Sequence, residues 1–281
     1  MDKKEESMSY EEAINKAGSG LYRFPLVDVQ GIPLMTRIAQ NWSSIWAFRP
    51  DPSDMLISTY PKAGTTWTQE IVDLLLHNGD ADICKRAPTT VRIPFLEINS
   101  PPPIPSGLDL LKKMKPPRFI KTHLPIQLVP EGFWENKCKV IYVARNAKDN
   151  LVSYYHFDRM NLIQPEPGSW EEYVQKFMKG KLAWGSWYDH VKGYWKEKEK
   201  RNILYLFYED MKEGRLETGP TTSHPFSPRC LMRTTPDKWL TWTFLFEPKY
   251  EKRQEESKPA LQDKSKINQN VKCSCTNIIH F

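Results

Sequence analysis

The stretch Met55-Leu-Ile-Ser-Thr-Tyr-Pro-Lys-Ala-Gly-Thr-Thr-Trp67 decides the fold of this chain. Its first five residues are mostly apolar or β-branched, which predicts a short buried strand. A loop with Pro61 and Gly64 follows, and apolar residues then recur at helical spacing from Thr66 to Leu76. The stretch therefore predicts a strand, a tight loop and a helix in succession.

The same alternation continues along the chain. Buried strands are expected at residues 55–59, 119–122, 139–144 and 203–208. Helices are expected over residues 66–76, from near residue 149, and over 170–179 and 185–200. Strands that alternate with helices favour an α/β fold. We expect a single domain with a central, mostly parallel sheet flanked by helices on both faces.

Two regions interrupt this pattern. Residues 88–118 are rich in proline, so they are expected to form an irregular surface segment. After residue 213 the composition changes, and residues 251–270 are almost entirely polar. We therefore expect one domain over residues 1–213 and a divergent, irregular and poorly ordered tail over 214–281.

Composition narrows the class of protein. The chain has 281 residues, enough to bury a sizeable core, and a diffuse net charge of +6 that fits a small anionic ligand better than nucleic acid. No apolar run approaches the roughly 18 residues of a membrane span, and residues 1–12 lack the apolar core of a secretory signal. The five cysteines form no metal-ligand spacing, and their odd number favours reduced thiols in the cytoplasm.

The loop after the first strand has residue types that bind a phosphate. A loop between a strand and a helix directs backbone N–H groups and the positive end of the helix dipole toward an anion. Gly64 permits close approach, Thr65 and Thr66 offer hydroxyls, and Lys62 adds a positive charge. The lysine precedes the glycine, unlike the Walker pattern Gly-x-x-x-x-Gly-Lys-Ser/Thr. A purely structural strand-to-helix turn is the alternative.

Further candidates follow the other strands. Lys121 and His123 end the second strand, where a histidine can accept a proton near neutral pH and a lysine can stabilise negative charge. Arg145 ends the third strand and can contact a phosphate through two N–H groups, and Ser153 lies in the next helix. Tyr208 closes the last strand, where it can reach an adenine or a phosphate. The alternatives are a hydrogen-bonded loop histidine, a surface arginine, an incidental helix serine and a core tyrosine.

Four longer motifs contain these candidate residues and follow one another along the chain. They are Tyr60-Pro-Lys-Ala-Gly-Thr-Thr-Trp67, Lys121-Thr-His-Leu-Pro125, Tyr142-Val-Ala-Arg-Asn-Ala-Lys-Asp149 and Phe207-Tyr-Glu-Asp210. Their order and spacing resemble those of the cytosolic sulfotransferases. The resemblance covers residues 20–213 and points to the family-1 enzymes that sulfonate phenols, with the 1C branch as the candidate within them.

The resemblance implies that the sulfonate donor is 3′-phosphoadenosine 5′-phosphosulfate. The positions that match the loop for its 5′-phosphosulfate are Lys62, Ala63, Gly64, Thr65, Thr66 and Trp67. Ala63 stands where many relatives have serine. Arg145 and Ser153 match contacts to the 3′-phosphate, and Tyr208 matches a contact on the adenosine side.

The resemblance also implies a mechanism. His123 matches the general base that deprotonates the acceptor hydroxyl. Lys62 and Lys121 match the lysines that stabilise the transferring sulfonate and the leaving phosphate. The acceptor-pocket positions are Phe95, Phe157, Ile163 and Trp184, which suit a small planar phenol. In-line transfer needs positioning, a base and cations, so no metal is expected.

Residues 214–281 depart from the family pattern. The adenosine-contacting Thr-Ser-Phe segment, the Arg-Lys-Gly motif that clamps the 3′-phosphate and the dimerisation sequence are not found there. An alternative exon or a shifted reading frame would produce such an abrupt change. Without the clamp we expect weaker donor binding, and without the dimerisation sequence a homodimer is doubtful and the oligomeric state stays open. We also expect low stability, because the sheet would lack covering helices.

The sequence leaves three alternative functions, each from a different class. The first is an active sulfotransferase, and the second is a catalytically impaired variant that binds the nucleotide weakly or acts as a regulatory partner. The third is a small-molecule kinase that shares only a phosphate loop. A transfer assay with a phenol separates the first two. The absent Walker spacing disfavours the third, which phosphate transfer from ATP would revive.

Overall fold

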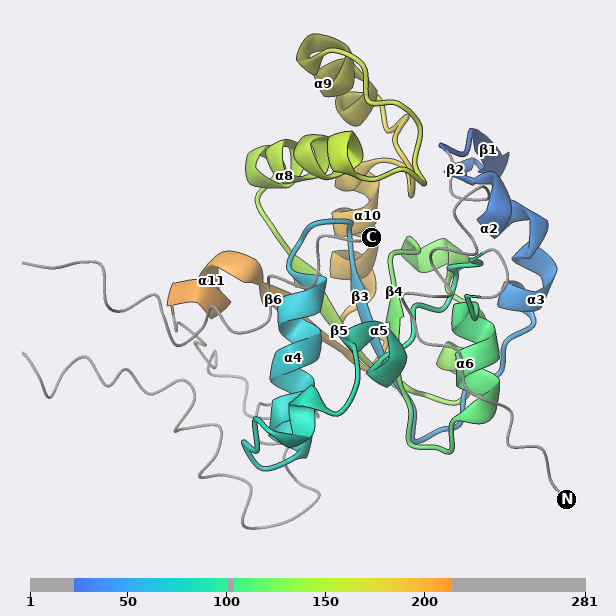
Figure 1. Cartoon of the computed structure of the whole chain (residues 1–281), viewed down its shortest axis with the longest axis vertical. Helices are drawn as coiled ribbons and strands as arrows, with labels where there is room; N and C mark the ends of the chain where they lie inside the picture. The colour runs from blue at the N-terminus through green and yellow to red at the C-terminus, as the bar shows by residue number, and fades with distance from the viewer. Residues whose placement is uncertain (1–22, 101–103, 214–281) are drawn as a thin grey trace, which may run out of the picture.

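The computed structural model describes residues 23–100 and 104–213 (Figure 1). Residues 1–22, 101–103 and 214–281 lie outside the described residues. The predicted tail and the predicted boundary at residue 213 therefore stay predictions.

Four parallel strands form the central sheet. They are β3 (Met55–Thr59), β4 (Phe119–Thr122), β5 (Lys139–Ala144) and β6 (Ile203–Phe207). The strand order is β4-β3-β5-β6, and Met55 pairs with both Phe119 and Lys139. All five residues of β3 are buried, as expected for a central strand covered on both faces. The expected strands are confirmed, except that the last one ends at Phe207.

Longer helices connect these strands. They are α4 (Thr65–Leu76), α8 (Ala147–Met160), α9 (Trp170–Met178) and α10 (Trp187–Glu197). The first three lie within two residues of the bounds expected for them, whereas α10 begins two residues later and ends three residues earlier than the expected 185–200. Within the described part of the chain, no helix combines the length and the apolar character that crossing a membrane requires.

Shorter elements complete the described fold. They are the hairpin strands β1 (Leu26–Val29) and β2 (Ile32–Met35), the helices α2 (Thr36–Gln40), α3 (Trp42–Trp46), α5 (Thr89–Arg92), α6 (Gly107–Lys113), α7 (Gly132–Glu135) and α11 (Tyr208–Glu213), and the 3-10 helices η2 (Ile83–Lys85) and η3 (Ile126–Leu128). Tyr208 begins α11, whereas the sequence places it at the end of the strand.

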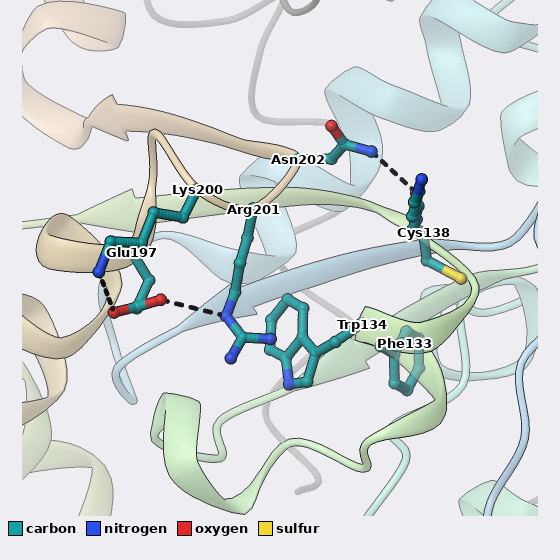
Figure 2. A pocket seen from close by; sticks show the side chains of 8 residues that line it. Phe133, Trp134, Cys138, Glu197, Lys200, Arg201 and Asn202 are labelled. Carbon is teal, nitrogen blue, oxygen red and sulfur yellow. Dashed lines mark hydrogen bonds and ion pairs between the residues drawn. The ribbon is translucent and has the colours of Figure 1, made fainter.

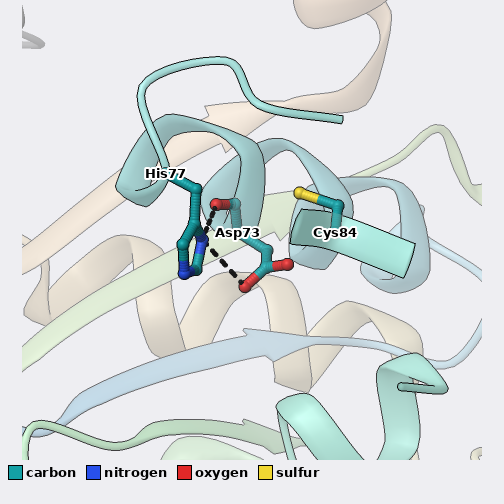
Figure 3. Close-up of side chains that lie close together, drawn as sticks. All are labelled: Asp73, His77 and Cys84. Atoms are coloured by element: carbon teal, nitrogen blue, oxygen red, sulfur yellow. Dashed lines mark hydrogen bonds and ion pairs between the residues drawn. The ribbon is translucent and has the colours of Figure 1, made fainter. Parts of the chain in front are cut away.

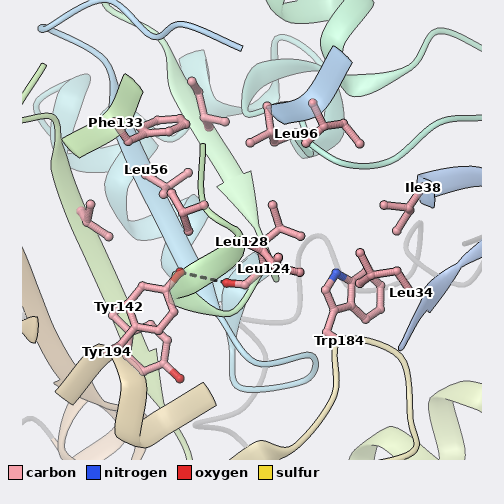
Figure 4. Close-up of a cluster of buried hydrophobic side chains, with 14 of the residues drawn as sticks. Leu34, Ile38, Leu56, Leu96, Leu124, Leu128, Phe133, Tyr142, Trp184 and Tyr194 are labelled. Carbon is pink, nitrogen blue, oxygen red and sulfur yellow. Dashed lines mark hydrogen bonds between the residues drawn. The ribbon is translucent and has the colours of Figure 1, made fainter. Parts of the chain in front are cut away.

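Side chains that alternate along the strands pack on opposite faces of the sheet. On one face, Ile57 and Val143 pack with Val72 of α4 and Met211 of α11. On the other face, a larger cluster joins the sheet to the hairpin, α6 and α10 (Figure 4). Tyr142 of β5 and Tyr194 of α10 stack there with ring centroids 4.1 Å apart. The expected helices on both faces are therefore confirmed, whereas the covering helices expected to be missing would follow residue 213 and lie outside the described residues.

The proline-rich region also differs from its prediction. Instead of an irregular surface segment, it contributes α5, α6 and several buried side chains to the core. Leu96, Leu108 and Leu111 are all at most 4% exposed. A few leucines that pack against the sheet outweigh the local tendency of the prolines to form loops. Pro101 to Pro103 lie outside the described residues.

Candidate active site

The predicted catalytic residues meet at one edge of the sheet. Because the strands are parallel, their carboxyl ends lie together, which is where ligands bind in open α/β sheets. Lys62 follows β3, His123 follows β4 and Arg145 follows β5. The fold therefore gathers residues from three separate sequence motifs.

The loop between β3 and α4 has an unusual backbone. Lys62 and Gly64 both have positive φ, at 69° and 100°. A Cβ atom added to Gly64 would lie 2.6 Å from Cδ2 of Tyr208, so a side chain at this position would displace the tyrosine ring. No side chain caps the amino end of α4 at Gly64. A small anion therefore has a close backbone approach to this helix end.

Two side chains from the β5–α8 junction hold this loop in shape. Nη1 of Arg145 donates a hydrogen bond to the carbonyl of Lys62 at 2.9 Å, and the amide of Asn150 donates one to the carbonyl of Pro61. Asn146 caps α8 by accepting from the N–H of Lys148. Arg145 is thus fixed between the end of a strand and the start of a helix.

Arg145 also stacks on Tyr208. Its Cζ atom lies 4.5 Å from the centroid of the tyrosine ring, and Trp67 meets that ring edge-on at 5.5 Å. Nε of Arg145 is buried and has no hydrogen-bond partner in the described structure. Arg145 therefore keeps an N–H group, at Nε, that can donate a hydrogen bond to a ligand beside Gly64.

Three cations of the site have no carboxylate partner in an ion pair with any described residue: Lys62, Lys121 and Arg145. Burial lowers the pKa of Lys62, and nearby Arg145 lowers it further while Asp158 opposes the shift. Burial lowers the pKa of Lys121 to about 8. A group of unpaired cations that repel one another favours the binding of an anion.

His123 is held in one tautomer. Its Nδ1 lies 2.8 Å from the carbonyl oxygen of Thr59, which can only accept, so Nδ1 carries the proton. Burial lowers the pKa of His123 well below its usual value, and Lys121 adds to the shift. The imidazole is therefore neutral at physiological pH. Its Nε2 lone pair is available to accept a proton.

Aromatic side chains surround these groups. Phe95 and Trp184 flank the His123 ring, with centroids 4.9 and 5.2 Å away. Nζ of Lys62 lies 4.2 Å from the centre of the Phe157 ring, and Nζ of Lys121 lies 4.2 Å from that of Phe95. Three of the four predicted acceptor residues thus contact catalytic candidates. Ile163, the fourth, packs against the core cluster that contains Trp184.

The remaining predicted residues lie in the loop after β3 and on the two helices that start at this edge. The hydroxyl of Thr65 is 2.6 Å from that of Thr59, so it helps to join β3 to α4. Ala63 is buried beneath the loop, and Thr66 is half-buried in the first turn of α4. Ser153 is half-buried in the second turn of α8.

Sequence reasoning missed one buried acid in the site. Glu97 is 0% exposed and accepts hydrogen bonds from the N–H of His123 and the indole of Trp184. Its signal is a single carboxylate in the apolar run Ile93-Pro-Phe-Leu-Glu-Ile98. A carboxylate among apolar residues is buried only when other groups satisfy it.

Two other features lie away from this edge. A cavity of about 370 Å³ opens beside Cys138 and Asn202, which precede β5 and β6 at the opposite end of the sheet (Figure 2). Three charged side chains of its wall pair with one another, since Glu197 contacts both Lys200 and Arg201. This cavity is therefore separate from the predicted site.

The second feature is a cluster of possible metal ligands at the end of α4. Asp73, His77 and Cys84 each bring one such atom within 4.8 Å of the others (Figure 3). Both carboxylate oxygens of Asp73, however, accept hydrogen bonds from guanidinium groups, of Arg86 and of Arg92. Two guanidinium groups at the carboxylate repel a cation, so we interpret this cluster as a structural ion-pair network.

Known families and proteins resemble this chain. The sulfotransferase domain family matches residues 52–217. Sulfotransferase 1 family member D1 of Rattus norvegicus is 56% identical over 193 residues, which are 69% of this chain and 65% of the relative. Sulfotransferase 1C2 of Homo sapiens is also 56% identical, over 66% of this chain and 63% of the relative. The two identities are equal, so they do not distinguish the 1C branch within family 1.

Solved structures show the same fold. A crystal structure of the mouse sulfotransferase SULT7A1 complexed with PAP matches with a TM-score of 0.53 and 31% identity, over 67% of this chain and 63% of that one. Retinol dehydratase in a complex with retinol and PAP matches with a TM-score of 0.64 over 85% of this chain and 78% of that one. The second match, at 23% identity, supports the fold alone.

The match to the curated relatives is partial in both directions. It spans 65% of the length of the rat relative, or less than two thirds of it. The part that matches the sulfotransferase domain family, residues 52–217, contains the loop after β3, His123, Arg145 and Tyr208. The chain belongs to the sulfotransferase family, and its curated relatives place it with the family-1 sulfotransferases.

Proposed function

We propose that this chain transfers a sulfonate group from 3′-phosphoadenosine 5′-phosphosulfate to a hydroxyl group of a small-molecule acceptor. The observation that carries the proposal is the meeting of a neutral, buried His123 with three cations that lack ion-pair partners among the described residues. A base and an anion-binding site at one sheet edge are what sulfonate transfer requires.

The site fits such a donor. Gly64 lets the Tyr208 ring pack directly on the loop backbone, where an added Cβ atom would lie 2.6 Å from it, and Nε of Arg145 is buried without a partner among the described residues. The loop residues Lys62 to Trp67 would hold the 5′-phosphosulfate, Arg145 and Ser153 the 3′-phosphate, and Tyr208 the adenosine side. The relative SULT7A1 was crystallised with PAP, the product that the donor leaves after transfer, which supports this choice of nucleotide.

The chain's own residues would then perform the reaction. Nε2 of His123 would take the proton of the acceptor hydroxyl while Thr59 holds the Nδ1–H. Lys62 and Lys121 would stabilise the negative charge that develops on the sulfonate and the leaving phosphate. Phe95, Phe157, Ile163 and Trp184 would surround a planar acceptor and keep water from the reacting groups.

The test is sulfonate transfer by the whole 281-residue chain to a simple phenol such as 4-nitrophenol. We expect formation of the aryl sulfate that depends on the donor, and no phosphate transfer when ATP replaces it. An absence of aryl sulfate with a chain that is folded would contradict the proposal. Phosphate transfer from ATP would instead support the kinase alternative.

A second candidate is a catalytically impaired variant that binds the nucleotide weakly. It is favoured by the sequence of residues 214–281, in which the Arg-Lys-Gly clamp for the 3′-phosphate is not found. Loss of two or three charge-assisted contacts, at roughly 1.5–3 kcal/mol each, would weaken binding by orders of magnitude. Calorimetric titration with PAP tests this, because a full-pattern relative measured in parallel gives the reference affinity. Equal affinities would exclude the impaired variant.

Three accompanying predictions concern partners, location and metals. The expected partner is a small-molecule hydroxyl acceptor, with no role for nucleic acid or membrane, and a homodimer is doubtful. The cytoplasmic location stays a prediction from the sequence. The absence of a metal requirement is tested by adding a chelator to the transfer assay, which should leave the rate unchanged.

A further inference from the structure

The segment that precedes α6 lies alongside β4 like an additional strand. Phe95 forms a parallel bridge with Lys121. The N–H of Lys121 donates to the carbonyl of Pro94, and the N–H of Leu96 donates to the carbonyl of Lys121. This pairing brings Phe95 and Glu97 against the residues that end β4. Two residues of one short segment thus reach the candidate base and its neighbouring lysine.

Glu97 binds three groups of the site at once. Its Oε1 accepts from the backbone N–H of His123 at 2.7 Å and from the indole N–H of Trp184 at 3.0 Å. Its Oε2 accepts from the hydroxyl of Thr122 at 2.9 Å. The carboxylate is completely buried. It therefore fixes the backbone of the base and one wall of the acceptor pocket relative to each other.

Trp184 needs such a constraint. Its φ is 65°, a left-handed conformation that a bulky residue rarely adopts. Its backbone N–H donates to the carbonyl of Pro33 in the hairpin, so the hairpin holds the backbone of Trp184 while Glu97 holds its indole. The bond to Glu97 determines how this ring faces His123.

Glu97 also acts on the charge of Lys121. Burial is the main influence on the pKa of this lysine and lowers it; the charge of Glu97 raises the pKa and that of Lys62 lowers it further. The charge of Lys121 in turn adds to the effect of burial in lowering the pKa of His123. Without the carboxylate, burial and Lys62 would both act to remove the proton from Lys121.

Burial of this carboxylate is unfavourable in itself. Desolvation raises the pKa of Glu97 to about 7, although all of its hydrogen bonds act in the opposite direction. A fully buried acid that costs folding energy and lies among the reacting groups fits a functional role better than a stabilising one.

We propose that Glu97 is a positioning residue for sulfonate transfer, which holds His123 and Trp184 in place and keeps Lys121 positively charged. This inference rests on the proposed function. It assigns to Glu97 two effects that can be measured separately, one on geometry and one on charge.

The first test is the pH profile of transfer by Glu97→Gln in the whole chain. Glutamine keeps the shape, and its carbonyl can accept the bonds from His123 and Trp184. Its amide N–H must donate to the Thr122 hydroxyl instead of accepting from it, and the charge is lost. We expect the rate to fall at least tenfold near pH 8 and its alkaline limb to move by at least half a unit toward lower pH. Glu97→Asp keeps the charge, so its alkaline limb should stay in place while kcat falls.

Glu70→Gln is the matched control. Glu70 is a half-buried acid of α4 that contacts Arg92 and Thr89 on the other side of the sheet. Its pH profile should coincide with that of the unmodified chain. A Glu97→Gln profile that also coincides with it would overturn the proposal.

The second test does not depend on transfer. The rate at which an amine-reactive acetylating reagent modifies Lys121, measured by peptide mass spectrometry against pH, reports the proton affinity of that lysine. In the unmodified chain we expect a midpoint well below that of exposed lysines, and in Glu97→Gln a still lower one. An unchanged midpoint in the variant contradicts the proposal. If the variant does not fold, the unmodified chain decides alone: a Lys121 midpoint equal to that of exposed lysines contradicts the proposal. If the unmodified chain makes no aryl sulfate, the proposed function fails while this measurement still decides the role of Glu97.

Discussion

At the scale of single residues, the site depends on where protons and charges are held. The carbonyl of Thr59 fixes the tautomer of His123, and burial keeps that ring neutral. Sequence reasoning predicted His123, Lys62 and Lys121 because their motifs are specific. It missed Glu97, since the apolar residues around that acid give no indication of which groups it will contact.

Glu97 should make the stability of the chain depend on pH. Its pKa is raised from 4.5 unfolded to about 7 folded, so between these values the folded state holds a proton that the unfolded state has lost. The stability that this group contributes is therefore complete below pH 4.5 and is lost as pH rises toward 7. Glu97→Gln removes this titration. Relative to the unmodified chain, its free energy of unfolding should increase by about 3 kcal/mol over that range, as urea unfolding measures. A difference independent of pH would show that Glu97 titrates normally.

Asp73 should be important for stability alone. It is 3% exposed and contacts Arg92, which is itself buried. Asp73→Asn leaves that guanidinium without full compensation, so unfolding should become easier by about 3–5 kcal/mol. Asp82→Asn, which removes the exposed partner of Lys85, is the control and should have no measurable effect. Addition of zinc should not raise the melting temperature of the unmodified chain; a rise that Asp73→Asn abolishes would identify a metal site instead.

At the scale of elements, the strands were predictable and several connections were not. The expected strands agree with β3 to β6 because each is a continuous apolar run bounded by polar or turn-forming residues. The hairpin β1–β2 was not predicted, since its strands have four residues each and a mixed pattern. Residues 88–118 were predicted as surface because prolines dominate their local signal, whereas the burial of Leu96, Leu108 and Leu111 depends on packing that only the folded chain shows.

The loop between β3 and α4 should lose its shape and bind PAP more weakly when Gly64 gains a side chain. Gly64→Ala would place a methyl group 2.6 Å from the Tyr208 ring in a left-handed backbone. We expect at least tenfold weaker binding of PAP by calorimetry, together with lower stability. Gly31→Ala is the matched control, because Gly31 also has a positive φ but nothing lies within 4 Å of an added Cβ. It should cost about 1 kcal/mol of stability and leave binding unchanged. Equal binding by the two variants would show that the Gly64–Tyr208 contact does not shape the nucleotide site.

At the scale of the whole molecule, three separate motifs lie together because the sheet is parallel. The carboxyl ends of β3, β4 and β5 bring Lys62, His123 and Arg145 to one edge, while α4 and α10 cover opposite faces. The family and this edge were predictable from sequence, because long motifs in register specify both. The contacts of Tyr208 with Gly64 and of Glu97 with Trp184 were not, because each joins segments far apart in the chain.

The most direct measurement compares the unmodified 281-residue chain with His123→Ala in sulfonate transfer from 3′-phosphoadenosine 5′-phosphosulfate to 4-nitrophenol, at saturating concentrations of both. His77→Ala, at the far end of α4, is the control. We expect aryl sulfate from the unmodified chain and from His77→Ala. We expect a fall in kcat of at least about 100-fold in His123→Ala, with PAP binding unchanged, because a general base contributes about that much or more. Equal rates in the unmodified chain and His123→Ala would contradict this role of His123.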